Sequence, residues 1–296
     1  MLLNSSLLIL AAMIWGGGFI ATKWTFVDYG PFWSNSIRFI VASLFISPFL
    51  IYKFKLKRPW KFYLWPFVCA VVLYLSMQTQ TIGLKYTTVA KSGFITTLYA
   101  FFTPIILMFY KKHRYQKSYW FLLKLCLLGI ALLCDFKFEQ FNQGDAWTLL
   151  CAILFAIQII ITDKITNDYN SIELNGYICL FVALVSYPVA FFMEGDLIVT
   201  PLLTIDNFFP HSTLFGFVIL GIFSSNLAFS IQAYAQKTIP PHIVSLIFLL
   251  ESIFAAIFGY YFLQETLSVL NLFGCALVLF SLILIPKYGK KITLDH

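Results

Sequence analysis

The fold of this chain is decided by stretches such as residues 240–263, which read PPHIVSLIFLLESIFAAIFGYYFL. Glu251, near the middle, is the only residue of the stretch with a formal charge. Because about 20 apolar residues in a helix span the hydrocarbon core of a bilayer, this stretch is long enough to cross a membrane. A carboxylate at the bilayer centre costs roughly 2.5–3.5 kcal/mol on insertion scales, which makes Glu251 a candidate functional residue.

Similar stretches recur along the chain and predict an all-α membrane protein with about ten transmembrane helices. We place these helices at residues 4–27, 31–52, 61–83, 87–110, 117–134, 144–162, 172–193, 212–235, 240–263 and 267–286. Only 11% of the 296 residues are charged and 60% are hydrophobic, whereas a soluble domain carries about 25% charged residues. The composition therefore excludes a soluble globular protein.

The basic residues are concentrated on alternate connections between the predicted helices. With a cytoplasmic N-terminus, the connections on the inner side carry Lys53, Lys55, Lys57, Arg58, Lys61, Lys111, Lys112, Arg114, Lys117, Lys164 and Lys237, and the tail adds Lys287, Lys290 and Lys291. This asymmetry predicts that both termini are cytoplasmic. It also explains the net charge of +7 through contact with anionic lipid rather than nucleic acid.

An internal repeat appears when the chain is shifted by 140 positions. The shift aligns Thr22 with Thr162, Asp28 with Asp168, Tyr29 with Tyr169, Asn35 with Asn175, Leu44 with Leu184 and Pro48 with Pro188. We therefore expect two five-helix repeats, residues 1–138 and 139–296. An odd number of helices per repeat requires opposite insertion, and inverted repeats are typical of transporters. A duplication without transport is the alternative.

Four charged residues fall well inside predicted helices: Arg38, Lys91, Lys124 and Glu251. Long basic side chains can extend to the interface, which is one interpretation of Arg38, Lys91 and Lys124. Lys91 has polar neighbours that also allow a functional role. Glu251 is too central to reach the interface, so it is either a buried structural partner or a site residue.

Neutral polar and aromatic residues complete the candidate set. Gln78, Gln80, Gln158, Asn226 and Gln232 lie in predicted spans, where hydrogen bonding between helices is the structural alternative. Trp15 precedes three glycines, Gly16 to Gly18, which permit either close packing or a hinge. Tyr74 and Tyr99 are further candidates for the wall of a cavity.

Signatures of an enzyme are absent from the sequence. It has no phosphate-binding Gly-rich loop with lysine, no pair of histidines at metal-binding spacing and no nucleophile elbow. We therefore expect neither catalysis nor a cofactor nor a metal.

Several segments resemble the EamA family of the drug/metabolite transporter superfamily. They are Trp15-Gly16 followed by Phe19, Arg38-Phe39 followed by Ala42, residues 83–99 running on to Pro104, Leu250-Glu251-Ser252, and residues 263–268. Ser252 departs from the family pattern, which often has proline there. The resemblance implies a bacterial inner-membrane carrier with an inverted-repeat bundle around a central cavity.

These observations together predict a secondary transporter of small metabolites that works by alternating access. Export is the expected direction, amino acids are the leading substrate class, and a proton is a possible coupling ion at Glu251. The expected substrate-binding residues are Trp15, Arg38, Tyr74, Gln78, Lys91, Tyr99, Asn226 and Glu251. We expect a monomer or weak homodimer. A flippase for lipids or lipid-linked metabolites is the alternative function, and a membrane enzyme or channel fits less well.

Overall fold

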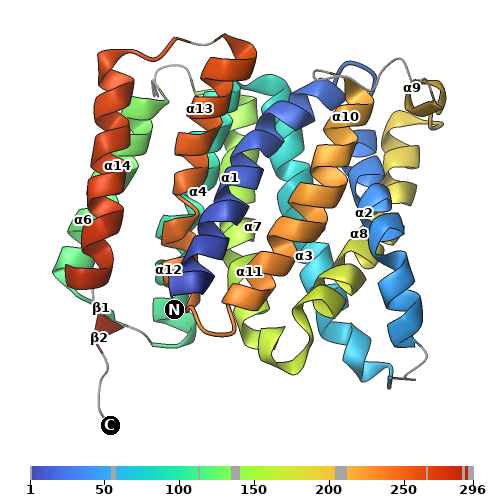
Figure 1. Cartoon of the computed structure of the whole chain (residues 1–296), viewed down its shortest axis with the longest axis horizontal. Coiled ribbons are helices and arrows are strands. Elements are labelled where there is room, and N and C mark those ends of the chain that lie inside the picture. Colours follow the sequence, from blue (N-terminus) through green and yellow to red (C-terminus); the bar gives the residue numbers. More distant parts are fainter. Residues whose placement is uncertain are drawn as a thin grey trace.

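The computed structural model describes residues 2–54, 58–112, 114–134, 141–203, 212–264, 266–288 and 291–292, which form a bundle of helices (Figure 1). The one described sheet has two short strands, β1 (Arg114–Tyr115) and β2 (Lys291–Ile292), which pair antiparallel with Arg114 opposite Ile292. The prediction of an all-α architecture is confirmed.

The first half of the chain contains α1 (Leu2–Thr25), α2 (Pro31–Phe54), α3 (Lys61–Tyr86), α4 (Val89–Thr97), α5 (Tyr99–Tyr110) and α6 (Lys117–Leu133). The second half contains α7 (Gln143–Ile165), the 3-10 helix η2 (Thr166–Asp168), α8 (Ser171–Glu194), α9 (Thr200–Leu203), α10 (Thr213–Val218), the π-helix η4 (Ile219–Ala228), α11 (Phe229–Ala235), α12 (Pro241–Ile247), α13 (Leu250–Leu263) and α14 (Val269–Tyr288).

Local sequence sets several of these helix ends. Asn142 and Asp145 form a capping box, in which each side chain accepts a hydrogen bond from the backbone of the other. Asn170 accepts from the first backbone N–H groups of α8. At the other end of α8, Gly195 adopts a φ of +78°, which residues with a side chain rarely adopt.

Eight helices among the described residues are long and apolar enough to cross a membrane. They are Leu2–Thr25, Pro31–Lys53, Lys61–Tyr86, Val89–Tyr110, Gln143–Asp168, Ser171–Glu194, Thr213–Ala235 and Pro241–Phe262. Several are composite: α4 and α5 form one, α10, η4 and α11 form another, and α12 and α13 form a third. The protein is therefore an integral, multi-pass membrane protein.

The remaining two predicted spans are occupied by α6 and α14, which are shorter apolar helices. Helix α6 has 17 residues, or about 25 Å at 1.5 Å per residue, against a hydrocarbon core of about 30 Å. The apolar part of α14 is Val269–Ile285. The count of ten transmembrane helices thus stays a prediction, while helices at all ten predicted positions are observed.

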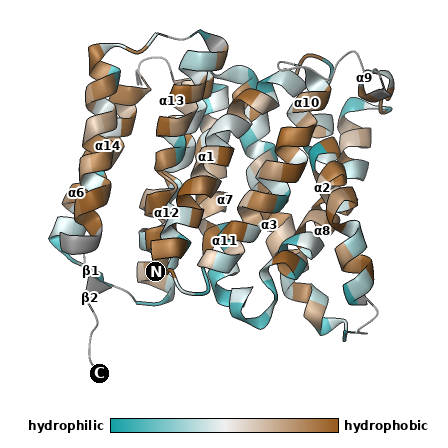
Figure 2. Cartoon of the chain, in the orientation of Figure 1, coloured by the Kyte–Doolittle hydropathy of each residue, from teal (hydrophilic) through white to brown (hydrophobic). Residues whose placement is uncertain are grey.

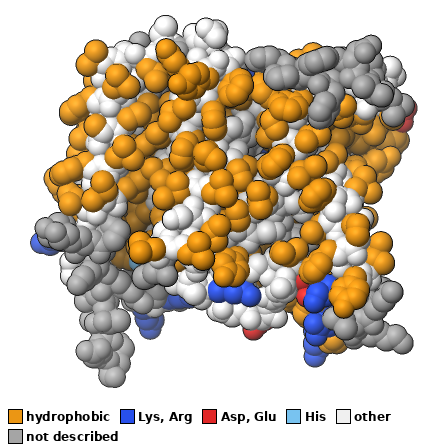
Figure 3. Space-filling view, viewed as in Figure 1, with side chains coloured by type: hydrophobic (Ala, Val, Ile, Leu, Met, Phe, Trp, Pro, Cys, Tyr) orange, Lys and Arg blue, Asp and Glu red, His pale blue; other side chains and the backbone are white. Residues whose placement is uncertain are grey.

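Hydrophobic side chains cover the outside of the bundle. Figure 2 shows hydrophobic residues along most helices, and Figure 3 shows hydrophobic side chains spread over the height of the visible face, with Lys and Arg confined to its lower part. Large side chains such as Phe109, Phe192 and Val269 are more than four-fifths exposed. Because such a surface would aggregate in water, lipid is its natural environment.

The helices pair in a pattern that surrounds a central region. Helices α2 and α8 pack together at one edge of the bundle, and α6 packs on α14 at the other (Figure 1). Between them, α1 packs on α13 and on the composite helix α10–η4–α11, while α3 and α5 pack on α7. The central helices α1, α3 and α7 therefore contribute the residues that face inward.

Some sequence predictions lie outside the described residues. They include the boundary between the two repeats at residues 138 and 139, and three of the basic residues, Lys55, Lys57 and Lys290.

Candidate functional site

Two helix interruptions bring Tyr99 and Glu251 together. Helix α4 ends at Thr97 and α5 begins at Tyr99, while α12 ends at Ile247 and α13 begins at Leu250. The Tyr99 hydroxyl donates a hydrogen bond to Glu251 Oε2 over 3.2 Å, and both residues are at most 5% exposed. Discontinuous helices commonly form the substrate sites of transporters, so both residues lie where a site is expected.

Arg38 is held by the π-helical segment η4. Its Nε donates to Ser225 Oγ and its Nη2 donates to Ser224 Oγ, each over 2.7 Å. Arg38 is buried, so it does not extend to the interface. Because π-helical turns frequently occur at functional sites, the position of Ser224 and Ser225 on η4 is itself a functional indication.

Trp15 forms an aromatic wall between these two groups. Its Nε1 donates to the carbonyl oxygen of Ser224 over 3.2 Å. Its ring lies 4.8 Å from that of Phe229 and 4.7 Å from that of Phe248, measured between centroids. The neighbouring Gly16 packs against the backbone of α13, where an added Cβ would lie 2.8 Å from the carbonyl oxygen of Glu251.

A cavity of about 40 Å³ lies between these residues. Its lining consists of Trp15, Gly18, Phe19, Thr22, Arg38, Met77, Gln80, Thr96, Tyr99, Phe155, Gln158, Ile159, Ser224, Phe229, Gln232, Phe248 and Glu251. A water molecule needs about 10–15 Å³ on this measure, so the volume suits a few waters. Binding of a metabolite therefore requires the helices to separate.

Arg38 and Glu251 are the only charged side chains in this lining. Neither has an ion-pair partner among the residues that the structure describes. The cavity thus combines one cationic group, one carboxyl group and an aromatic wall. Within the described part of the chain, no group of three or more His, Cys, Asp or Glu residues could hold a metal ion.

Four of the predicted binding residues line the cavity: Trp15, Arg38, Tyr99 and Glu251. The other four lie elsewhere. Tyr74 does not line the cavity; it packs in a hydrophobic cluster that shares Phe229 with the lining. Gln78 accepts a hydrogen bond from Asn35, and Asn226 donates to the carbonyl oxygen of Ala42.

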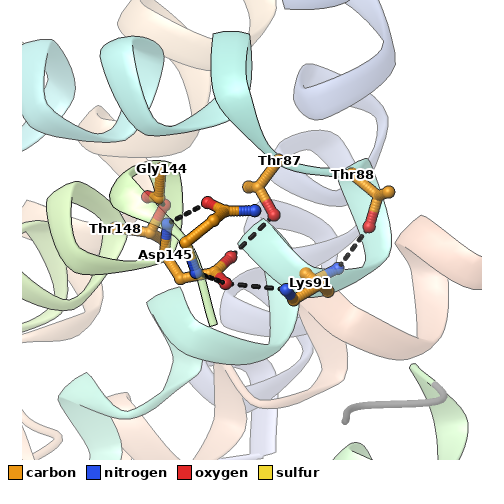
Figure 4. Close-up of polar contacts among 7 residues, drawn as sticks. Thr87, Thr88, Lys91, Gly144, Asp145 and Thr148 are labelled. Carbon is orange, nitrogen blue, oxygen red and sulfur yellow. Dashed lines mark hydrogen bonds and ion pairs between the residues drawn. The ribbon is translucent and has the colours of Figure 1, made fainter. Parts of the chain in front are cut away.

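Lys91, the eighth predicted binding residue, lies in an ion pair outside the cavity lining. Its Nζ donates to Asp145 Oδ2 over 2.6 Å, while the Thr87 hydroxyl donates to Oδ1 over 2.7 Å (Figure 4). Asp145 is completely buried. The pair connects the start of α4 to the start of α7, which gives Lys91 a structural contact rather than a place in the cavity.

The lining also includes residues that the sequence did not single out as binding residues, notably Phe155, Gln158, Ile159 and Gln232. The internal repeat indicates three of these residues, Phe155, Gln158 and Ile159. Trp15, Gly18, Phe19 and Thr22 share one face of α1, and a shift of 140 positions leads to Phe155, Gln158, Ile159 and Thr162 on α7. Applied to Trp15, the repeat would have indicated this second wall.

The model of the EamA-like transporter family matches residues 3–134 and 142–286. The chain belongs to the EamA-like transporter family. The resemblance inferred from Trp15-Gly16, Arg38-Phe39 and residues 83–99 is therefore confirmed. Membership of this family assigns the EamA-like protein to the transporters rather than to the enzymes.

Two relatives and one solved structure resemble this EamA-like transporter over most of its length. It is 29% identical over 279 residues to an uncharacterized transporter of Archaeoglobus fulgidus, covering 94% of this chain and 84% of that protein. It is 24% identical over 266 residues to an S-adenosylmethionine uptake transporter of Rickettsia bellii, covering 86% and 83%. A crystal structure matches with a TM-score of 0.75 at 15% identity over 96% of each chain, which supports the fold alone.

Proposed function

We propose that this EamA-like transporter carries small zwitterionic metabolites, with amino acids and their derivatives as the leading class, by alternating access. One observation carries the proposal: Arg38 and Glu251 line the same cavity, and neither is neutralised by an ion-pair partner in the described part of the chain. A buried charge is costly unless it is paired, so a ligand with a carboxylate and an ammonium group would complement both.

The individual contacts fit such a ligand. Two N–H groups of Arg38 are used by Ser224 and Ser225, which leaves the rest of the guanidinium to bind a carboxylate. The carboxyl group of Glu251 can receive an ammonium group or a coupling proton. The ring of Trp15 and its aromatic neighbours would contact the apolar part. The relative from Rickettsia bellii is named as an S-adenosylmethionine uptake transporter. S-adenosylmethionine also carries a carboxylate and an ammonium group on one carbon, as an amino acid does.

Contacts at equivalent positions support ten helices arranged as two inverted repeats. Asn35 of α2 donates to the carbonyl oxygen of Met77 on α3, and Asn175 of α8 donates to that of Ser225 on η4. Tyr29 donates to the carbonyl oxygen of Ile198 in the connection after α8, and Tyr169 donates to that of Phe62 at the start of α3. The two family-model matches fall on either side of the proposed boundary.

We propose further that both termini are cytoplasmic and that the membrane is a bacterial inner membrane. Helix α1 begins and α14 ends at the lower edge of Figure 1, and the Lys and Arg side chains visible in Figure 3 gather along that edge. Excess positive charge marks the cytoplasmic side. Export is the proposed direction, although the relative from Rickettsia bellii is named for uptake.

Transport assays with the purified protein in proteoliposomes test this function. The substrates are radiolabelled L-amino acids and S-adenosylmethionine, measured in both directions with and without an imposed proton gradient. Saturable flux that follows the gradient in the wild type and is lost in Glu251→Gln is the expected result. The control is Glu173→Gln, because Glu173 is buried but lies outside the cavity lining.

Each other outcome corrects a defined part of the proposal. Flux that is unchanged by the proton gradient and by Glu251→Gln would contradict proton coupling and would indicate a facilitator. An absence of flux for every substrate, in protein shown to be folded, contradicts the amino-acid class.

A lateral groove is the observation that favours the flippase alternative. It lies on the lipid-facing side of α2, α8 and η4, has a volume of about 620 Å³ and is lined almost entirely by apolar surface, with Phe45, Ile172 and Asn226 among its residues. A flippase would use such an opening for an acyl chain. Competition by phospholipid headgroups, but not by amino acids, would favour this function.

A further inference from the structure

The amide side chains beside the cavity form a hydrogen-bonded chain with one unused end. Gln236 Nε2 donates to the carbonyl oxygen of Ile159 over 2.8 Å. Gln232 Nε2 donates to both Gln236 Oε1, over 2.9 Å, and Gln158 Oε1, over 3.2 Å. Gln232 Oε1 is buried and has no hydrogen-bond partner among the described residues. Gln232 is one of the residues that line the cavity, so a ligand that enters when the helices separate can approach this acceptor.

The orientation of Gln232 follows from its neighbours. A backbone carbonyl only accepts hydrogen bonds, so Gln236 must direct its Nε2 toward Ile159 and its Oε1 toward Gln232. Gln232 must then place its Nε2 between the two facing amide oxygens. A flipped Gln232 would set its own oxygen against both of these acceptors. The hydrogen-bonded chain therefore fixes Oε1 of Gln232, a residue of the cavity lining, as the acceptor that remains unused.

The separation between Arg38 and Gln232 sets a minimum length for a ligand that contacts both. Ser224, which binds Arg38, and Gln232 are eight residues apart on the composite helix η4–α11, or roughly 12 Å along the axis at 1.5 Å per residue. A ligand that reaches from Arg38 to Gln232 must be extended. Long amino acids and nucleoside-bearing derivatives can span such a distance, and alanine or glycine cannot.

We propose that Gln232 is a specificity-determining residue that accepts a hydrogen bond from an N–H group at the end of the substrate remote from its carboxylate. This inference rests on the proposed transport function and narrows its substrate class. The favoured cargo is an elongated zwitterion with a side-chain amino or amide group, in addition to its α-ammonium group. Gln158 and Gln236 are positioning residues, because they orient Gln232 without offering the free acceptor.

Two matched probe pairs test the role of Gln232 in proteoliposomes. The first is L-glutamine with L-glutamic acid γ-methyl ester, and the second is S-adenosylmethionine with its analogue carrying purine in place of adenine. In each pair the second member lacks the remote N–H donor; the ester also carries a methyl group that the amide does not. The half-saturation concentration is measured for each probe in the wild type and in Gln232→Leu. The matched control is Gln78→Leu, a buried amide that does not line the cavity.

The wild type is expected to favour the N–H-bearing member of at least one pair by about tenfold, since a buried acceptor without a partner is costly. In Gln232→Leu the two members of that pair should bind equally, while Gln78→Leu keeps the wild-type ratio. A merely structural role of Gln232 would lower the flux of both members together and preserve the ratio, which would overturn the inference. Saturable flux without any donor preference in the wild type would also overturn it. An absence of flux for every probe would instead contradict the transport function itself, and this inference with it.

Discussion

Arg38 is bound on two of its N–H groups by hydroxyl groups and not by a carboxylate. The two serines hold the guanidinium in place without neutralising its charge, so the positive charge remains available to a ligand. A guanidinium also offers a planar, paired set of donors that an ammonium group lacks. At this residue, geometry as well as charge should therefore matter.

We predict that Arg38→Lys lowers transport even though it keeps the positive charge. A lysine cannot reproduce the contacts to Ser224 and Ser225 together with a carboxylate contact. The half-saturation concentration for the proposed amino-acid substrate should rise by about tenfold or more, which corresponds to a loss of about 1.4 kcal/mol in binding. Uptake kinetics in proteoliposomes measure this change. Wild-type kinetics in Arg38→Lys would mean that Arg38 does not contact the substrate.

Gly16 provides a second prediction at this scale. In Gly16→Ala the new Cβ would lie 2.8 Å from the carbonyl oxygen of Glu251 and 2.9 Å from the backbone nitrogen of Ala255. Because backbone cannot move aside cheaply, we expect a loss of about 1–3 kcal/mol in stability. Thermal unfolding in detergent should show a lower midpoint. The matched control is Gly93→Ala, since nothing lies within 4 Å of a Cβ there; equal midpoints for both variants would contradict the packing role of Gly16.

At the scale of helices, the ends were far easier to predict than the interruptions. Residues 31–52 and 61–83 were predicted as helices, and α2 and α3 cover Pro31–Phe54 and Lys61–Tyr86, because Pro and Gly in the connections mark helix ends. The breaks, at Leu98 and at Phe248-Leu249, contain neither proline nor glycine. Such breaks depend on packing against other helices, which hydrophobic periodicity does not record.

In the candidate site, the charged residues can be predicted from the sequence, but their contacts cannot. Glu251 and Arg38 were found because charge is rare inside membranes. Lys91 satisfied the same criterion, yet its partner Asp145 lies 54 positions along the chain. Sequence distance conceals this ion pair, whereas the polar neighbours of Lys91 place it among the predicted binding residues. Gln78 and Gln232 were both recognised as intramembrane amides, but only the structure separates a helix contact from a cavity wall.

The asparagines of α2 and α8 give a prediction at this scale. Replacing Asn35 or Asn175 with Asp removes the Nδ2 donor that binds the backbone of the next long helix. Hydrogen bonds between membrane helices contribute about 0.6–1.7 kcal/mol, so both substitutions should lower the thermal midpoint by similar amounts. Ser47→Ala is the control, because Ser47 donates only within its own helix. A loss confined to one of the two asparagines would argue against equivalent roles.

Across the whole molecule, the two ends of the bundle differ in how deeply their contacts are buried. At the upper end of Figure 1, the buried pair of Lys91 and Asp145 joins α4 to α7. At the lower end, Lys111 and Asp163 form a more exposed ion pair, and α1 meets the connection after α11 through an exposed hydrogen bond from Asn4 to Thr238. In an alternating-access carrier, the upper end should therefore be the harder one to open.

We predict that Asp145→Asn increases access to the cavity from the upper side. The readout is labelling of Thr22→Cys by a membrane-impermeant maleimide, in a background without the six native cysteines. Labelling should be several-fold faster in Asp145→Asn, and the charge exchange Lys91→Asp with Asp145→Lys should restore slow labelling. The control is Asp163→Asn, which breaks the more exposed pair with Lys111. Unchanged labelling in Asp145→Asn would show that the ion pair does not hold this end closed.

The contact between α6 and α14 places a joint restriction on how this sequence can evolve. A Cβ on Gly129 would lie 2.8 Å from the carbonyl oxygen of Gly274, and a Cβ on Gly274 would clash in turn with that of Gly129. Each glycine thus leaves room for the backbone of the other helix. A mutation in either codon separates the same pair of helices, so selection acts on the two codons as one unit. Neither can drift alone, although they lie in different halves of the gene.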